Sequence, residues 1–176
     1  LNIVQNITRA EIENDVTLSS AHDLTLAATS SQTVTTTAHA GAASTGGTAV
    51  SLAVALAIVN TTTTAQLGNG TLVTFTGAVN VSATHTGATT TLAMGDTTSD
   101  GTAIGAALAL SFVNETTTAT TGRALSAAGA VSFNAHATAT SAPTGHDEGN
   151  RSAATGSLSA KDGRGETVAE PEPRRW

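Results

Sequence analysis

The chain has 176 residues, of which 11% are charged and 2% aromatic, and it contains no Cys or Tyr. An enzyme normally has a thick core and a polar cleft, which need more large and charged side chains than this chain contains. We therefore expect no enzymatic activity. The lack of Cys excludes disulfide bonds, thiolate metal sites and a Cys nucleophile. Only seven Lys and Arg are present, without a basic stripe, so nucleic acid is not an expected partner.

A unit of about 54 residues recurs along the chain. Two sets of segments align, one beginning at Leu1, Leu56 and Leu110 and the other at Leu24, Val79 and Val131. We therefore predict a first repeat at 1–55, truncated at its N-terminus, a second at 56–109, a partial third at 110–144, and a polar irregular tail at 145–176.

Within each unit the apolar residues recur at every second position, which predicts strands and not helices. In chain order, we expect a strand block at 16–26 that bends at 21–23, a Gly-rich loop at 41–47 and a strand at 50–58. The same order then repeats, with a block at 73–81 that bends at 77–78, a loop at 95–101 and a strand at 104–112. A last block is expected at 125–133, with its bend at 128–130. The apolar run at 49–59 is too short to span a membrane as a helix. We expect thin layers of Val, Leu, Ile and Ala to be buried between strands.

The strings DVTLSSAHDLTLAA at 15–28 and AVNVSA at 78–83 resemble rungs of giant repetitive bacterial surface proteins of the filamentous-haemagglutinin and autotransporter adhesin class. The resemblance covers residues 1–142 and implies an all-β chain, folded as a right-handed parallel β-solenoid. It also implies export to the bacterial cell surface and work as an adhesin stalk or matrix fibre. Because the common rung of that class is shorter than this unit, each unit would be one wide, flattened coil or two ordinary coils. An array of antiparallel β-hairpins is the alternative arrangement.

An amide side chain recurs at one position of the repeat, as Gln5, Asn60 and Asn114. In a parallel stack, identical columns become neighbours, so these amides can hydrogen-bond to one another along the array. We interpret them as a structural amide column.

Metal and ligand signals are weak. Asp96 and Asp100 lie in a Gly-flanked segment and are the candidate ligands for Ca²⁺, although a plain turn explains them as well. The five His do not share one repeat column, because His85 aligns with Ser30 and His136 with Thr84, and we interpret them as scattered surface residues. No other metal site or cofactor is expected.

Runs of Thr at 35–37, 61–64, 89–91 and 116–118 would form rows of hydroxyl and methyl groups on a flat face. Such rows are what an ice-binding β-solenoid needs, which is one alternative function; a polysaccharide-acting β-helix enzyme is another. The favoured function is a structural or adhesive, fibre-forming segment of a large secreted or cell-surface protein. Its expected partners are further copies, through the exposed repeat ends, and a surface glycan or a receptor on a host or neighbouring cell.

Overall fold

The structure is a computed structural model that describes residues 1–19 and 21–149, and its regular elements are all β-strands. The strands are β1 (Asn2–Ile12), β2 (Leu24–Ser44), β3 (Thr48–Leu67), β4 (Val73–Phe75), β5 (Val79–Ser99), β6 (Thr102–Thr121), β7 (Leu125–Ala127) and β8 (Val131–Gly149). In this described part of the chain, no helix is long and apolar enough to cross a membrane.

Strands from successive repeats pair side by side and in parallel. They form two long sheets, in the orders β1-β3-β6 and β2-β5-β8, and a short sheet of β4 and β7. Leu24 lies beside Val79, and Val79 beside Val131, as the repeat alignment predicts. The prediction of a parallel β-solenoid is therefore confirmed, and the alternative of antiparallel hairpins is wrong.

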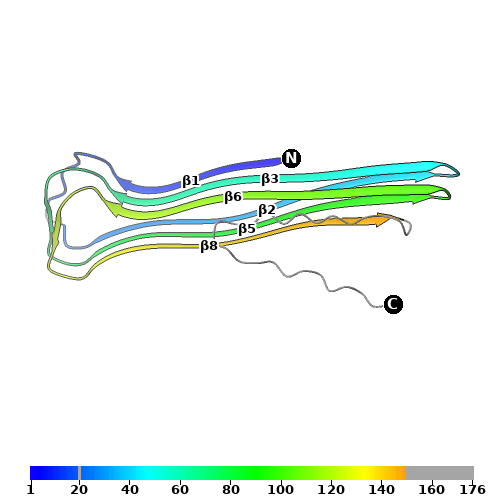
Figure 1. Cartoon of the computed structure of the whole chain (residues 1–176). Coiled ribbons are helices and arrows are strands. Elements are labelled where there is room, and N and C mark those ends of the chain that lie inside the picture. The colour runs from blue at the N-terminus through cyan, green and yellow to red at the C-terminus, as the bar shows by residue number, and fades with distance from the viewer. Residues whose placement is uncertain (20, 150–176) are drawn as a thin grey trace.

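Each repeat makes one wide coil and not two ordinary ones (Figure 1). The chain runs along β3, crosses through β4, returns along β5 and reverses into β6 beside β3. Because β3 and β5 have 20 and 21 residues, the coil is about 65 Å wide. The two long sheets lie face to face, spread apart where β4 and β7 close one end, and converge at the tight turns of the other end (Figure 1).

The converging end is closed by a turn shorter than the sequence predicts. We expect a loop at 41–47, but β2 continues through Ser44, so the turn consists of residues 45–47. Gly46 and Gly47 have φ of 86° and 143°, values that residues with a side chain rarely adopt. The equivalent turn between β5 and β6 is Asp100-Gly101. These turns reverse the chain tightly, which brings the two sheets close together there.

The interior changes character along the width of the coil. Near β4 and β7, the core contains larger side chains, including Phe75, Val79 and Val81. Near the turns, it is made of Ala, including Ala53, Ala55, Ala93 and Ala109. Side-chain size thus follows the distance between the sheets.

The strand blocks predicted at 73–81 and 125–133 bend where predicted, between β4 and β5 and between β7 and β8. The strand predicted at the start of the block 16–26 is wrong, because residues 13–19 and 21–23 form no strand and β2 begins at Leu24. The C-terminal boundary differs from the prediction, because β8 extends to Gly149, whereas we expect an irregular tail from residue 145. The rest of that predicted tail, from residue 150, lies outside the described residues.

Candidate functional site

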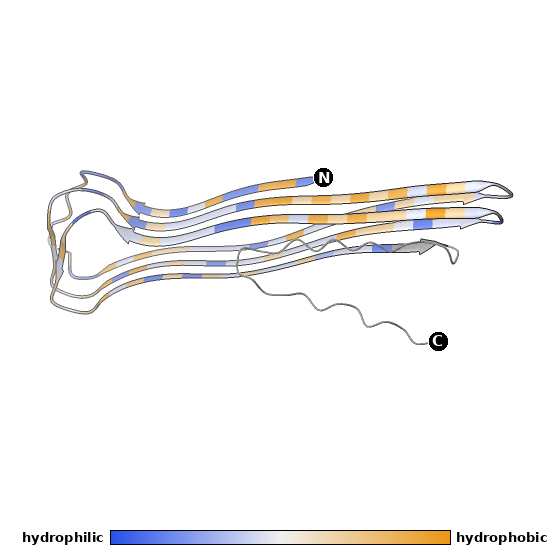
Figure 2. Cartoon of the chain, in the orientation of Figure 1, coloured by the Kyte–Doolittle hydropathy of each residue, from blue (hydrophilic) through white to orange (hydrophobic). Residues whose placement is uncertain are grey.

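The outer face of the β1-β3-β6 sheet carries a large apolar surface. Along β3 the side chains alternate, so that Ala55 is fully buried while Leu52 is 64% exposed. The same alternation in β6 exposes Phe112, and β1 adds Ile3 beside Ile58. Figure 2 shows the resulting apolar bands in the halves of β3 and β6 that lead to the turns. We call this set the outer apolar patch; its members are Ile3, Val50, Leu52, Val54, Leu56, Ile58, Ile104, Leu108, Leu110 and Phe112.

These large side chains point outward because the interior has no room for them. An added Cβ on Gly95 would lie 3.0 Å from the backbone oxygen of Ala106, and one on Gly145 would lie 2.9 Å from that of Ala107. Two sheets this close accept only Gly, Ala, Ser or Thr between them. Our expectation that Val, Leu and Ile fill the interior is therefore wrong for residues 50–58, although it is right for Ala and for the wider end.

The outer apolar patch has polar borders and no charge within it. Its outward columns end at Thr48 and Thr102 on the turn side and at Asn60 and Asn114 on the other. The outward positions between these borders, at 50–58 and 104–112, hold no charged residue. An uncharged apolar centre with a polar rim is typical of protein–protein interfaces.

The opposite outer face, on the β2-β5-β8 sheet, is rich in Thr. Register places Thr29 beside Thr84, Thr35 beside Thr90, and Thr86 beside Thr138. Neighbours are about 7 Å apart along a strand and about 4.8 Å apart between strands. The outward Thr are Thr25, Thr29, Thr33, Thr35 and Thr37 on β2, Thr84, Thr86, Thr90 and Thr98 on β5, and Thr138, Thr140 and Thr144 on β8.

The predicted Thr runs are thus divided between surface and interior. In the run at 35–37, the middle residue is buried; in the run at 89–91, the two outer residues are buried and Thr90 is exposed. The run at 61–64 alternates across the other sheet, so that Thr61 and Thr63 are buried. Period-two alternation turns each run into regularly spaced Thr on one face.

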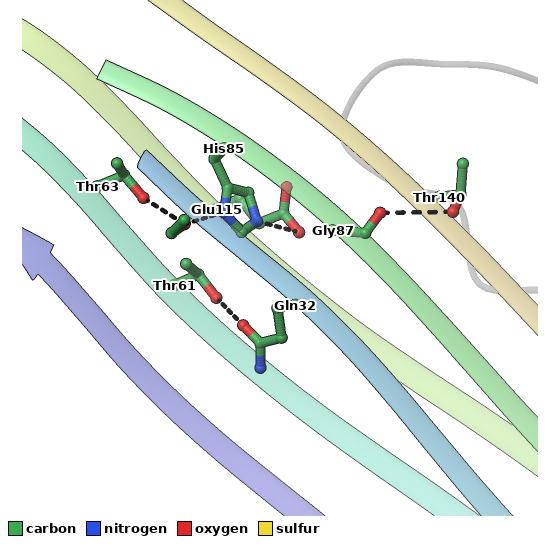
Figure 3. A network of polar contacts seen from close by, with 8 residues as sticks. Gln32, Thr61, Thr63, His85, Gly87, Glu115 and Thr140 are labelled. Carbon is green, nitrogen blue, oxygen red and sulfur yellow. Dashed lines mark hydrogen bonds and ion pairs between the residues drawn. The ribbon is translucent and has the colours of Figure 1, made fainter. Parts of the chain in front are cut away.

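A polar network lies between the two sheets (Figure 3), nearer to the end closed by β4 and β7 than to the turns. The Ser30 hydroxyl is 2.9 Å from Thr63 Oγ1 and 2.5 Å from His85 Nδ1. On the other side of the ring, His85 Nε2 is 3.2 Å from Glu115 Oε1. Gly87 leaves the space that the Glu115 carboxylate occupies, because an added Cβ there would collide with Oε1. Four strands, β2, β3, β5 and β6, contribute to this cross-link between the sheets.

The network has the atom order of a nucleophile–base–acid arrangement but no access to substrate. In hydrolases, a Ser bonded to His and a His bonded to a carboxylate activate the hydroxyl for attack. Here Ser30 is only 7% exposed and His85 is fully buried. A substrate could reach Ser30 Oγ only if the two sheets separated. We therefore interpret the network as a cross-link that joins the sheets and holds them in one relative orientation.

Our interpretation of the His as surface residues is wrong for His85, although His22, His39 and His136 are exposed. A signal was present in the sequence. His85 has the same parity as Val79 and Val81 in an alternating strand, so it must share their buried face.

Arg123 links three successive coils at the end closed by β4 and β7. It is 5% exposed, and its guanidinium donates to backbone oxygens of both preceding coils. The bonds are Nε to Gly68 O at 2.6 Å, Nη1 to Val16 O at 2.7 Å, and Nη2 to Asn69 O at 2.9 Å and Glu13 O at 3.1 Å. A planar guanidinium is suited to such divergent acceptors. No pattern in the sequence singled out this residue.

The predicted amide residues share one outward column. Gln5 lies beside Asn60 and Asn60 beside Asn114, and Asn114 Nδ2 donates to Asn60 Oδ1 at 3.0 Å. This column borders the outer apolar patch.

The two candidate calcium ligands lie in different settings. Asp96 is on the outer face of β5, where Oδ2 is 2.5 Å from His39 Nε2, while Asp100 lies in the turn that follows β5. Among the described residues, there is no group of three or more His, Cys, Asp or Glu that could hold a metal ion.

Neither a family model nor a curated protein nor a solved structure matches this chain.

Proposed function

We propose that this chain is a structural and adhesive segment of a larger extracellular repeat protein of bacterial cell surfaces, in which further coils extend the two long sheets. The observation that supports this is in-register stacking with open edges. Among the described strands, β1 and β2 have one neighbour each in the long sheets, and so do β6 and β8 at the other edge. Unpaired strand edges are templates for another strand, which a further coil of the same design provides.

The same edges can join separate copies end to end, so a fibre is the expected assembly. The wide, Thr-rich outer face of the β2-β5-β8 sheet supplies the contact area for adhesion to a surface glycan or to a receptor on a neighbouring cell. Since the described interior is filled by packed side chains and polar cross-links, we assign the function to the surfaces and edges.

Insertion of extra coils tests this proposal. Residues 56–109 would be duplicated in register once and three times within the full chain, and the shape measured by small-angle X-ray scattering and electron microscopy. Each added coil should lengthen the stack by about 4.8 Å, leave the width of about 65 Å unchanged, and raise the unfolding temperature. Chains that instead grow as separate beads would contradict the proposal.

Adhesion needs its own assay. Beads coated with the full chain should bind a glycan array or fixed cells above the level of beads coated with albumin, and equal binding would remove the adhesive part of the proposal.

Ice binding is the second candidate function, and the regularly spaced outward Thr of the β2-β5-β8 sheet favour it. The test is thermal hysteresis and ice shaping by the full chain. Thr35→Tyr and Thr90→Tyr should abolish the effect, whereas Thr62→Tyr, on the outer face of the other sheet, should not. A full chain without thermal hysteresis would eliminate this candidate.

A further inference from the structure

We propose that two copies of this chain pack face to face through the outer apolar patch. The contact would use the broad face of the β1-β3-β6 sheet and not the strand edges, so it is independent of end-to-end assembly.

The area of the patch is that of a stable interface. From the exposed fractions of its members, such as 62% for Val50, 50% for Ile104 and 54% for Phe112, it presents on the order of 800 Å² of apolar surface. A typical monomer has no single apolar patch above about 300–600 Å², and one partner of a standard protein interface contributes about 800 Å². The apolar area of the patch is therefore larger than that of a face normally exposed to solvent, and it equals the area that one partner contributes to a stable dimer.

The chemistry of the patch selects its occupant. It has no hydrogen-bonding side chain between its borders, so a glycan would lose its hydration without compensation. Among the described residues it has no cationic rim, because Arg9 pairs with Glu11 at 3.3 Å and Arg123, which is 5% exposed, lies at the end closed by β4 and β7. These two are the only Lys or Arg in the described part of the chain, so that part has no exposed cluster of positive charge to draw this face to an anionic membrane.

A second copy matches the patch in both shape and polarity. The same sheet face, turned by a two-fold rotation, presents the same rows of large side chains, and two such faces pack at about 10 Å as in a β-sandwich. The amide pair of Asn60 and Asn114 then lies at the rim, where it stays hydrated. Such a contact is isologous and closes at two copies, whereas edge pairing grows without limit.

Substitutions on the patch test this proposal in the full chain. Leu52→Thr with Phe112→Thr removes two large exposed groups and introduces in their place Thr, a β-branched residue that favours strands. We expect the parent chain to form a dimer in sedimentation velocity, and the double variant to raise the dimer dissociation constant at least about 100-fold. Leu92→Thr, on the outer face of the other sheet, is the matched control and should leave the constant unchanged. Far-UV circular dichroism verifies that each variant is folded.

A second measurement does not depend on these variants. Because the chain has no Cys, Val54→Cys and Thr90→Cys each create a single labelling site, on opposite outer faces. Spin labels at residue 54 should show strong dipolar coupling between copies, whereas labels at residue 90, which three sheet spacings of about 10 Å each separate in such a dimer, should show much weaker coupling. A parent chain that is monomeric at every concentration would overturn the proposal, as would stronger coupling at residue 90 than at residue 54. So would a parent chain that binds phosphatidylcholine vesicles through the patch without forming dimers.

Discussion

Replacement of Arg123 by Met tests how the stacked coils are held together. Met has a similar length, but it removes the guanidinium that donates to four backbone oxygens of the two preceding coils. If these bonds connect the coils, their loss should destabilise the whole stack and not only the neighbouring loops.

The magnitude follows from the exposure of the four acceptors. Hydrogen bonds to a charged group contribute about 1.5–3 kcal/mol, and a buried acceptor without a partner costs a similar amount. Gly68 is buried, so the loss of the bond to its oxygen should cost both the bond energy and the penalty for an unpaired acceptor. Glu13, Val16 and Asn69 are exposed, and their oxygens can bind water instead. We therefore expect Arg123→Met to lower the free energy of unfolding by about 3–4 kcal/mol, a large part of the stability of a typical domain.

Urea unfolding followed by circular dichroism measures this loss, with the midpoint and the m-value fitted together. Arg9→Met is the matched control, because Arg9 is exposed and its ion pair with Glu11 is on the surface. It should change stability by less than about 0.5 kcal/mol. An Arg123→Met variant as stable as the Arg9→Met variant would refute the reasoning.

Three further substitutions probe the interior and the amide column. Gly87→Ala should destabilise the chain by about 2–3 kcal/mol, because the new methyl group collides with the Glu115 carboxylate; a neutral result in urea unfolding would show that Glu115 moves freely. Ala55→Leu should cost about 3 kcal/mol or prevent folding, since Ala55 is fully buried in the narrow part of the core, and a stable variant would contradict the close approach of the sheets. Asn114→Leu should lower stability by less than about 1 kcal/mol, because its bond to Asn60 is exposed; a larger loss would show that the amide column is essential to stacking.

Much of the fold follows from the sequence because repetition and alternation are local properties. The alignment of Asn60 with Asn114 requires only the period, and it sets the strand register across two coils. The parity of His85 with Val81 assigns the two residues to one face of β5, so the His shares the environment of the Val. The bend before β5 follows from Gly77 and Ala78.

What the sequence by itself determined is therefore the period, the strands, their register and the parity of each side chain. Only the tertiary structure decided which parity faces inward. Alternation in 50–58 is equally consistent with either choice, and the larger hydrophobic residues would normally be the buried ones. The decision depends on strands that are distant in the sequence, because Gly95 and Gly145 let the opposite sheet approach so closely that only small residues fit between. That spacing is a property of the two packed sheets, and it is the reason why Leu52 and Phe112 lie on the surface.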